Sequence, residues 1–324
     1  MENNNFNTPF VSICCIAYNH AAFIAQAMDS FLMQKTTFPI EIIIHDDAST
    51  DNTANIIKEY ALKHPNLIFP IFQNENQYSK GINPGTEYVI PRCKGKYIAV
   101  CEGDDYWIDP FKLQKQVDFL EANHEHGLVF TDADHYQECQ GKMIRAYDKT
   151  FRRKIPSGDV LSVFLQGINP YKTCTAVFRS SFIKEYKEIA SKHSLIMGDK
   201  SLWLLIAGKA KIGYINKSTS VYRIKENSVS HSDELEVLLK FLKSSYKATV
   251  FFSSYYNRPF ERKKNKQNCK KAILIYCASK KKYKQLFYYA RCFPLAIATI
   301  LKEFLRDLIV WVTNRKNKSY PAIM

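Results

Sequence analysis

The chain has 324 residues, of which 46% are hydrophobic and 24% charged, and its formal net charge is +15. This length and apolar content are typical of a globular protein with one large α/β domain and an appendage, or with two domains. The charge is distributed unevenly along the chain. Residues 1–232 contain 26 Lys and Arg and 25 Asp and Glu, whereas residues 233–324 contain 20 Lys and Arg and only 6 Asp and Glu. This asymmetry indicates two regions with different partners.

The nine cysteines include no C-x-x-C pair, and several of them lie in apolar stretches. This pattern favours reduced thiols in the core of a cytosolic protein and excludes a disulfide-rich scaffold or a cysteine metal site. The first residues lack a basic segment followed by an apolar one, so no secretory signal is expected.

Apolar, β-branched runs alternate with stretches of helical periodicity through the first 131 residues. The predicted strands are residues 10–17, 40–45, 67–72, 97–101 and 127–131. The predicted helices are residues 23–32, 52–63, 87–93 and 109–122, and Ser49 or Asp51 is expected to cap the second. This alternation predicts an α/β fold with right-handed crossovers and a mostly parallel sheet covered by helices on both faces.

Two pairs of adjacent carboxylates follow predicted strands. Asp46 and Asp47 end the second strand, and Asp104 and Asp105 come directly after Gly103 at the end of the fourth. Because ligands of open α/β sheets bind beyond the carboxyl ends of the strands, both pairs are expected to converge on one ligand site. Adjacent carboxylates repel each other unless a divalent cation lies between them and a ligand phosphate. The alternative for a single pair is a solvated turn in which Asp104 caps the next helix.

Two common nucleotide-binding motifs are missing from the sequence. No G-x-G-x-x-G follows the first strand, and G-x-x-x-x-G-K-[ST] does not occur. This argues against a dinucleotide-dependent oxidoreductase and against a P-loop NTPase. A pyrophosphate would have to be held by a metal and by side chains. The polar segment 74–86, which contains Gly and Pro, is expected to be a loop that contacts the site.

The middle of the chain is less regular. Residues 134–185 show little periodicity, apart from a strand-like run at 173–178. Asp199 then opens an apolar helix, where a carboxylate is stabilised by the positive end of the helix dipole. A purely structural role of Asp199 as an N-cap is the alternative. Residues 211–224 predict a returning hairpin that ends in Val221-Tyr222-Arg223.

Four ordered segments resemble a known family. They are VSICCIAYNH, EIIIHDDASTDNT, EGDDYW followed by Asp109-Pro110, and GDKSLWLL. In order and spacing, over roughly residues 8–228, the chain is similar to the inverting, nucleotide-sugar-dependent glycosyltransferases of family 2. The resemblance implies a GT-A (Rossmann-like) catalytic domain, which we place at residues 1–230. The basic region 231–324 lies outside the resemblance and is predicted to be helical.

The resemblance also implies roles for individual residues. Residues that would contact the nucleotide of the donor are Ala17, Tyr18, Asp46, Asp47, Glu102 and Asp104. Asp105 stands at the end of the family's D-x-D element and is the implied direct ligand of Mn²⁺ or Mg²⁺, which would bridge the diphosphate and neutralise the leaving group. Asp199 is the implied general base, which would take a proton from the acceptor hydroxyl as it attacks the anomeric carbon. A single base with in-line displacement implies inversion at that carbon.

Two positions depart from the family pattern. The D-x-D block often begins with Asp, and this chain has Glu102, a longer carboxylate that still suits a contact to the nucleotide. The family often has a histidine shortly after the Tyr-Arg of the last core strand, and this chain has Lys225. An ammonium group suits the charge of a diphosphate but is no metal ligand. His231 either substitutes for that histidine or is a surface residue.

The C-terminal region contains an amphipathic segment at residues 293–313. Its polar side chains fall within an arc of about 140° at 100° per residue, and its other face is apolar. Its four charged residues argue against a membrane-spanning helix and favour a helix lying in the plane of an anionic leaflet. The alternative is packing against the catalytic domain or against a second copy in a homodimer. No helix-turn-helix, zinc-finger or RNP-like pattern supports nucleic-acid binding.

Together these features predict a metal-dependent transferase that moves a sugar from a UDP- or dTDP-sugar to a glycan or lipid-linked acceptor. By family analogy it would act in surface-polysaccharide synthesis, in the cytoplasm at the inner face of the cell membrane. A nucleotidyltransferase is disfavoured because no glycine-rich, basic loop follows the first strand. A non-catalytic sugar- or nucleotide-binding scaffold is disfavoured by the presence of Asp105 and Asp199.

Overall fold

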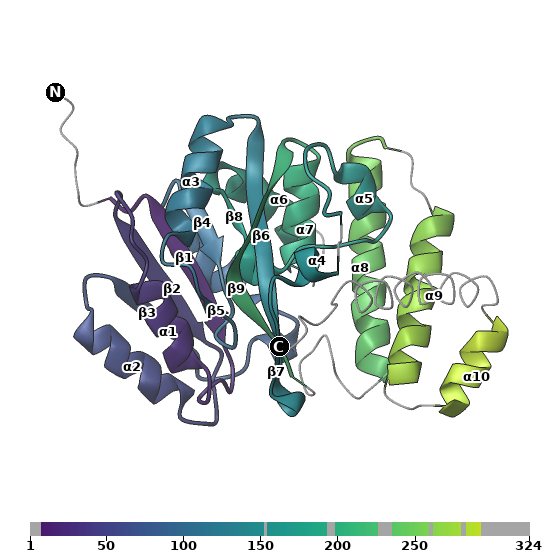
Figure 1. Ribbon diagram of the computed structural model, residues 1–324, viewed down its shortest axis with the longest axis horizontal. Coiled ribbons are helices and arrows are strands. Elements are labelled where there is room, and N and C mark those ends of the chain that lie inside the picture. Colours follow the sequence, from purple (N-terminus) through teal and green to yellow (C-terminus); the bar gives the residue numbers. More distant parts are fainter. Residues whose placement is uncertain are drawn as a thin grey trace, which may run out of the picture.

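The computed structural model of the protein describes residues 8–151, 154–192, 198–225, 235–258, 262–279 and 283–292. His231 and the predicted amphipathic segment 293–313 lie outside these residues, as does the predicted domain boundary between 230 and 231. The described residues form one α/β body, with a row of three helices beside it (Figure 1).

One mixed sheet organises the α/β body, with the strand order β3-β2-β1-β4-β8-β6-β9-β5 and with β7 paired to β6. The strands are β1 (Val11–Ala17), β2 (Ile40–Asp46), β3 (Ile68–Phe72), β4 (Tyr97–Val100), β5 (Tyr106–Trp107), β6 (His126–Gln137), β7 (Lys142–Ile144), β8 (Val177–Arg179) and β9 (Lys211–Ile224). Strands β3, β2, β1 and β4 are mutually parallel, whereas β8 is antiparallel to both of its neighbours. The α/β prediction is confirmed, and antiparallel pairs enter only in the second half of the sheet.

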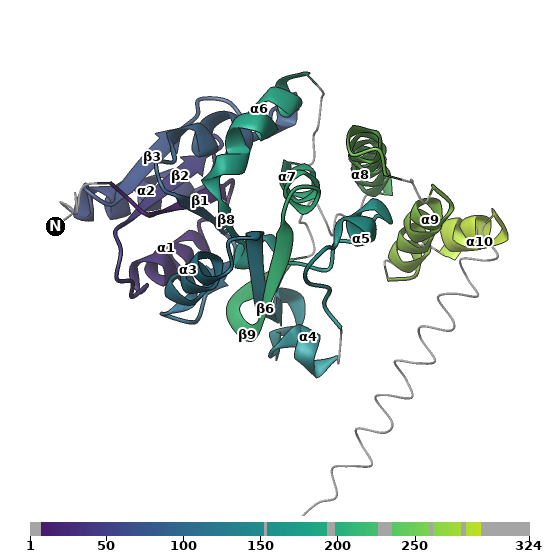
Figure 2. The same ribbon diagram turned by 90° about the horizontal axis from the view of Figure 1, so that it is seen from above.

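Helices cover both faces of this sheet. The described residues contain the helices α1 (Ile24–Leu32), α2 (Thr53–Lys63), α3 (Lys112–Ala122), α4 (Tyr147–Thr150), α5 (Leu161–Leu165), α6 (Ile183–Lys192), α7 (Gly198–Ala207), α8 (Leu235–Tyr255), α9 (Arg262–Ser279) and α10 (Tyr283–Cys292), of which α9 and α10 lie away from the sheet (Figure 1). Seen from above, α1 and α3 lie on one side of the strands and α6 and α7 on the other (Figure 2).

The apolar first strand shows why both faces are covered. Successive side chains of a strand point to opposite faces. Ile13 and Cys15 are therefore buried with helices α1, α2 and α3, while Cys14 is buried with α5, α6, α7 and α8. All nine cysteines lie in the described residues and form no disulfide. The sheet thus has a hydrophobic core on each side, as its nearly uninterrupted apolar strands predict.

Helix α8 belongs to one of these cores. Its Ala248 and Phe252 are buried in the same cluster as the side chains of α7. Just beyond the end of α8, the hydroxyl of Tyr256 donates a hydrogen bond to the carbonyl of Leu205 at 2.8 Å. Figures 1 and 2 both show α8 beside α5 and α7, with α9 and α10 farther out. The helical character predicted for the C-terminal region is confirmed for these three helices.

The outer helices form a small cluster of their own. Ile273 and Cys277 of α9 pack against leucines of α8 and against Tyr289 of α10. Asn268 of α9 also donates a hydrogen bond to the carbonyl of Gln166, just after α5, at 2.8 Å. Over the described ranges, no helix has both the length and the apolar content needed to cross a bilayer.

The hairpin predicted at residues 211–224 is wrong. These residues form the single strand β9, which runs parallel to β6 over its whole length. The polar residues Asn216 and Lys217 lie at a break in the register between the two strands. Thr131 of β6 pairs with Ile215 of β9, but Asp132 pairs with Ser218. Residues 216 and 217, which have no partner in this register, form an irregularity within β9 and not a turn between two strands.

Other boundaries also differ from the prediction. Strand β6 continues to Gln137, beyond the predicted end at residue 131, because its polar residues are hydrogen-bonded and buried. One of them, Asp134, accepts bonds from the hydroxyl of Ser218 at 2.5 Å and from the backbone N–H of Ala146 at 2.7 Å. The helix predicted at 87–93 is a short π-helical turn followed by a 3-10 turn. The first part of the predicted 173–178 strand is likewise a 3-10 turn.

Candidate functional site

The loops that follow β1 and β2 are joined by hydrogen bonds. The backbone N–H of Asn19 donates a hydrogen bond to the hydroxyl of Ser49 at 2.9 Å. The side-chain oxygen of Asn19 accepts a hydrogen bond from the N–H of Thr50 at 2.8 Å. The N–H of Ala21 donates to Asp51 at 3.0 Å. Asp51 also accepts a hydrogen bond from the N–H of Thr53 at the start of α2, although the N-cap position itself is Asn52 and not one of the two predicted caps. The two loops therefore form one rigid rim at the carboxyl edge of the sheet.

Two residues of this rim have left-handed backbone conformations. Asn19 has φ 54° and Ala48 has φ 60°. Such values cost free energy in a residue with a β-carbon, and they persist where the surrounding structure enforces them, often at functional sites. Ala17, at the end of β1, accepts the N–H of Asp47 at 2.9 Å, and Tyr18 is 42% exposed beside it. The structure thus places the predicted residues Ala17, Tyr18 and Asp47 side by side.

The two aspartates after β2 have different surroundings. Both carboxylate oxygens of Asp47 accept backbone N–H groups from the 74–86 loop, those of Gln77 at 2.8 Å and of Tyr78 at 3.0 Å. In Asp46, Oδ2 accepts the N–H of Ser49 at 3.1 Å, but Oδ1 is buried without a hydrogen-bond partner among the described residues. Buried carboxylate oxygens are rarely left unpaired. Asp46 therefore has the open acceptor of this pair, while Asp47 holds the loop.

The second pair of aspartates follows β4 and reaches two other strands. The turn begins at Gly103, whose N–H donates to the carbonyl of Ile16 in β1 at 2.9 Å. Asp104 Oδ2 lies 2.6 Å from the Nζ of Lys225, the residue after β9. It also lies 3.7 Å from the Nε2 of His20, in the loop after β1. Asp104 thus connects the ends of β1, β4 and β9.

Asp105 is only 3% exposed and lies against β9. Its Oδ1 accepts the backbone N–H of Arg223 at 2.8 Å. Burial, followed by the charge of Asp104, raises the pKa of Asp105 to about 8. Burial, Asp105 and Asp104 also raise the pKa of Glu102 well above its usual value. The charges of Glu102, Asp104 and Asp105 thus act on one another at the end of β4.

The guanidinium group of Arg223 is enclosed by aromatic rings. It lies 4.9 Å from the ring centroids of Phe23 and Tyr106 and 5.7 Å from that of Tyr136. It also donates a hydrogen bond to Gln26 of α1. These contacts anchor the end of β9 to α1 and β5, and they hold the backbone N–H of Arg223 against Asp105.

Asp199 lies in the first turn of α7, within electrostatic reach of Glu102. Its charge contributes to the raised pKa of Glu102, and together with burial it raises the pKa of Tyr78 in the 74–86 loop. The hydroxyl of Thr173 donates to its Oδ2 at 3.3 Å. The helix turn is held by Tyr186, whose hydroxyl donates to the carbonyl of Gly198 at 2.9 Å. Asp199 is therefore placed near the end of β4 by a helix from the opposite face.

The carboxylates suit a divalent cation that is shared with a ligand. Asp104 and Asp105 are adjacent, and burial, followed by the charge of Asp104, raises the pKa of Asp105. Mg²⁺ commonly binds one or two carboxylates together with substrate phosphates and water. In the part of the chain that the structure describes, no three His, Cys, Asp or Glu side chains gather closely enough to hold a metal by themselves. The remaining ligands would therefore come from a diphosphate and water.

The structure adds residues to those predicted from the sequence. His20, Thr173 and Arg223 contact the predicted carboxylates and were not predicted as site residues. His20 and Arg223 lie at or just beyond strand ends, a position that is a usable signal for a site. Thr173 lies in an irregular segment, and nothing in the sequence pattern singles it out.

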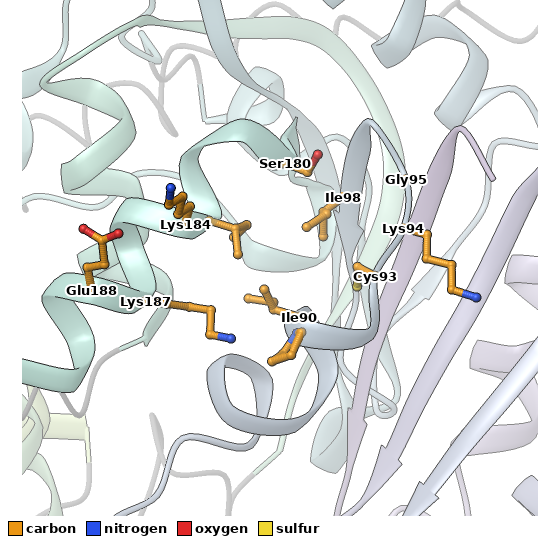
Figure 3. Close-up of a pocket in the computed structure, with 11 residues that line it drawn as sticks. Ile90, Cys93, Lys94, Gly95, Ile98, Ser180, Lys184, Lys187 and Glu188 are labelled. Carbon is orange, nitrogen blue, oxygen red and sulfur yellow. The ribbon is translucent and has the colours of Figure 1, made fainter. Parts of the chain in front are cut away.

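A separate pocket of about 510 Å³ lies between the 3-10 turn at Ile90–Arg92, the start of β4 and α6 (Figure 3). Lys184 and Lys187 of α6 lie across it from Ile90. Lys94 and Gly95, which line the pocket, precede β4, whereas Glu102 follows this strand. The pocket therefore lies at the opposite end of β4 from the carboxylates and does not belong to the candidate site.

The sequence comparisons concern the same part of the chain, from the first strand to beyond the carboxylates. The model of Glycosyl transferase family 2 matches residues 12–186. An uncharacterized protein of Mycobacterium tuberculosis is 34% identical over 222 residues, which cover 68% of this chain and 61% of that protein. UDP-Glc:alpha-D-GlcNAc-diphosphoundecaprenol beta-1,3-glucosyltransferase WfaP of Escherichia coli is 36% identical over 128 residues, which cover 40% of this chain and 47% of that protein. The chain thus spans less than two thirds of the length of these relatives.

A solved structure agrees with the fold. The crystal structure of S. aureus TarS 1-349 in complex with UDP-GlcNAc superimposes with a TM-score of 0.50 and 14% sequence identity. The match covers 96% of this chain and 93% of the TarS chain. At this identity the likeness concerns the fold alone, and it confirms the predicted GT-A arrangement of sheet and helices.

Proposed function

The chain belongs to glycosyl transferase family 2, and we propose that it transfers a sugar from a nucleoside-diphosphate sugar to a hydroxyl group of a glycan or lipid-linked acceptor. The observation that supports this proposal is that Asp199, which accepts a hydrogen bond from Thr173, lies close enough to Glu102 for its charge to raise the pKa of that carboxyl group. Sugar transfer with inversion uses two groups on opposite sides of the reacting carbon. One side holds the leaving diphosphate, and the other accepts the proton of the attacking hydroxyl.

The nucleotide is proposed to bind at the rim formed by the loops after β1 and β2. Tyr18 is exposed there for contact with the base, and Asp46 has an unpaired buried oxygen that suits a donor group of the base or ribose. We propose a UDP- or dTDP-sugar as the donor. The name of the E. coli relative gives UDP-Glc as its donor and a diphosphoundecaprenol-linked sugar as its acceptor, which supports a uridine nucleotide and a lipid-linked acceptor here.

The diphosphate is proposed to lie over Asp104 and Asp105. Mn²⁺ or Mg²⁺, held by these carboxylates and by the phosphates, would screen the charge that develops on the leaving nucleoside diphosphate. The chain itself fixes the carboxylates, because the backbone N–H of Arg223 orients Asp105 and the turn at Gly103 sets the position of Asp104. The anchored aromatic stack around Arg223 keeps this geometry in place before the donor binds.

Asp199 is proposed to be the general base. It would accept the proton of the acceptor hydroxyl, while the hydroxyl oxygen bonds to the anomeric carbon and the bond to the diphosphate oxygen breaks. Thr173 donates a hydrogen bond to Oδ2 of Asp199 and thereby orients the carboxylate. Displacement from one side inverts the configuration at the anomeric carbon.

The cellular setting is proposed from the family and from the basic C-terminal region. We infer a role in cell-surface polysaccharide synthesis, at the cytoplasmic face of the membrane. The amphipathic segment 293–313, outside the described residues, would attach the protein to the anionic leaflet. A homodimer formed through the same segment is the alternative.

The test is donor binding and donor turnover with matched variants. Calorimetry with UDP-, dTDP- and GDP-sugars, in Mn²⁺ and in chelator, is expected to show metal-dependent binding of one donor by the wild type. Asp105→Ala should lose this binding. Asp199→Asn should retain it but lose slow hydrolysis of the bound donor. Asp118→Asn, an exposed aspartate of α3, is the control and should behave as wild type.

Two results would contradict the proposal. If none of the donors binds to the folded protein, the chain is not a nucleotide-sugar enzyme. If a donor binds but the wild type and Asp199→Asn release nucleoside diphosphate at the same rate, Asp199 is not the base, and a non-catalytic sugar-binding role becomes the better explanation.

A further inference from the structure

Asp104 and Lys225 form an ion pair within the candidate site. The Nζ of Lys225 lies 2.6 Å from Oδ2 of Asp104, and both side chains are largely buried. The ring centroid of Phe23 lies 5.1 Å from the same Nζ. The Nε2 of His20 is 3.7 Å from the same carboxylate oxygen. The ammonium group therefore lies where a bound cation would neutralise the carboxylates.

The backbone beneath Lys225 is fixed, but its side chain is long. Two residues before it, Arg223 is held by its hydrogen bond to Asp105 and by its packing on Phe23 at 4.9 Å. Lys225 follows directly after β9. A lysine ammonium on a flexible four-carbon stem moves by several ångströms without moving its backbone. Lys225 is therefore able to exchange one anionic partner for another nearby.

An ammonium group and a divalent cation compete for Asp104. The ammonium occupies hydrogen-bonding distance of Oδ2, whereas Mg²⁺ binds carboxylate oxygens at about 2.1 Å. Both groups on one carboxylate would place three positive charges within a few ångströms in a partly buried site. The mutual repulsion is strong there, because little water screens it. One oxygen of Asp105, the other aspartate of the pair, is already engaged by the N–H of Arg223, so a metal at this pair depends on access to Asp104 as well.

We propose that Lys225 is an exchangeable cation, which neutralises Asp104 in the donor-free protein and moves to a phosphate oxygen of the donor when Mn²⁺ or Mg²⁺ enters. The donor-free protein accordingly binds divalent cations weakly, and a bound nucleoside diphosphate strengthens metal binding. The part that concerns the donor rests on the proposed function. The competition between Lys225 and the metal for Asp104 does not.

The test measures Mn²⁺ binding directly. Mn²⁺ is titrated into the full chain, with and without UDP, and the free ion is measured from its electron paramagnetic resonance signal. Lys225→Met keeps the length of the side chain and removes its charge. Without UDP, it should bind Mn²⁺ about tenfold more tightly than wild type, since removing one adjacent positive charge is worth at least that factor. UDP should then add less to the Mn²⁺ affinity than it adds in wild type. Lys225→Gln should agree with Lys225→Met, which guards against a folding defect in one variant.

Two controls locate the effect. Lys217 lies on β9, before Lys225. Its Nζ is 2.8 Å from Oδ2 of the buried Asp109, which is not one of the carboxylates proposed to hold the metal. Lys217→Met should therefore leave Mn²⁺ binding unchanged. Adding Asp104→Asn to Lys225→Met should abolish the gain in Mn²⁺ affinity, because the carboxylate for which the lysine and the metal compete is then absent.

The outcomes separate this inference from the proposed function. Equal or weaker Mn²⁺ binding by Lys225→Met and Lys225→Gln overturns it, and so does the absence of Mn²⁺ binding in all of these proteins. Should Lys225→Met bind Mn²⁺ more tightly while UDP and dTDP bind to neither protein, the competition stands and the proposed function fails. Tighter Mn²⁺ binding with a smaller effect of UDP supports both parts of the inference.

Discussion

Truncating Phe252 tests whether α8 is an integral part of the α/β core. The side chain is completely buried in the cluster that contains the side chains of α7. Truncation to alanine removes most of a buried aromatic surface of roughly 150 Å², which at about 25 cal/mol per Å² corresponds to about 3–4 kcal/mol. The cavity that remains keeps the cost in the range of about 3–5 kcal/mol measured for such changes. Phe252→Ala should therefore lower the free energy of unfolding by about 4 kcal/mol.

The assay is urea unfolding followed by circular dichroism and by tryptophan fluorescence. Because Phe252 packs with α7, the two signals should shift together to lower urea in Phe252→Ala. Val250→Ala, on the same helix but 37% exposed, is the matched control and should cost less than about 1 kcal/mol. The reasoning is refuted if Phe252→Ala leaves the fluorescence transition unchanged and only part of the helical signal is lost earlier. In that case α8 would unfold independently of the sheet.

Three further predictions concern a buried lysine, a strained turn and the C-terminal segment. Burial lowers the pKa of Lys200, which donates a hydrogen bond to Ser245 of α8, to about 8. The folded protein releases this proton before the unfolded chain does, so between pH 8 and 10 the unfolding free energy of wild type should rise relative to Lys200→Met, by up to about 1.4 kcal/mol per pH unit. Urea titrations at several pH values measure this, and a constant difference would contradict it. Ala48→Gly should raise the melting temperature through a gain of about 0.5–1 kcal/mol, because φ 60° is unfavourable for alanine; a lower melting temperature would show that the turn is not strained. Finally, a chain lacking residues 293–324 should sediment less with anionic vesicles than the full chain does, whereas equal sedimentation would rule out membrane attachment through 293–313.

Local patterns were sufficient for the first half of the fold. Residues 11–17 and 40–46 form strands because most of their side chains are apolar, β-branched or small, and both faces of the sheet are covered. The same reasoning failed at residues 211–224, where Asn216 and Lys217 resemble turn residues. Pairing with β6 continues on both sides of them, so they form an irregularity within one strand. That pairing partner lies far away in the sequence, and local periodicity contains no information about it.

The aspartates after β2 and β4 could also be predicted as site residues from the sequence, because they lie at strand ends, whereas Asp199 lies at the start of a helix. Parallel strands end at one edge of a sheet, and this brings the loops after β1, β2 and β4 together. The partners of these residues could not be identified in the same way. Asp47 is engaged by backbone N–H groups of the 74–86 loop, and Asp105 by the N–H of Arg223. Backbone contacts of this kind leave no pattern in the side chains.

The sequence by itself determined the fold class and the family, and it predicted the carboxylates of the candidate site, since each of these depends on residue types in motifs that follow one another along the chain. The tertiary structure decided which charges meet. Asp104 lies beside Lys225 and His20, although the three belong to separate parts of the chain. Electrostatic energy depends on distance and burial in space. The balance between these carboxylates, the lysine and a metal therefore follows only from the folded arrangement of β1, β4 and β9.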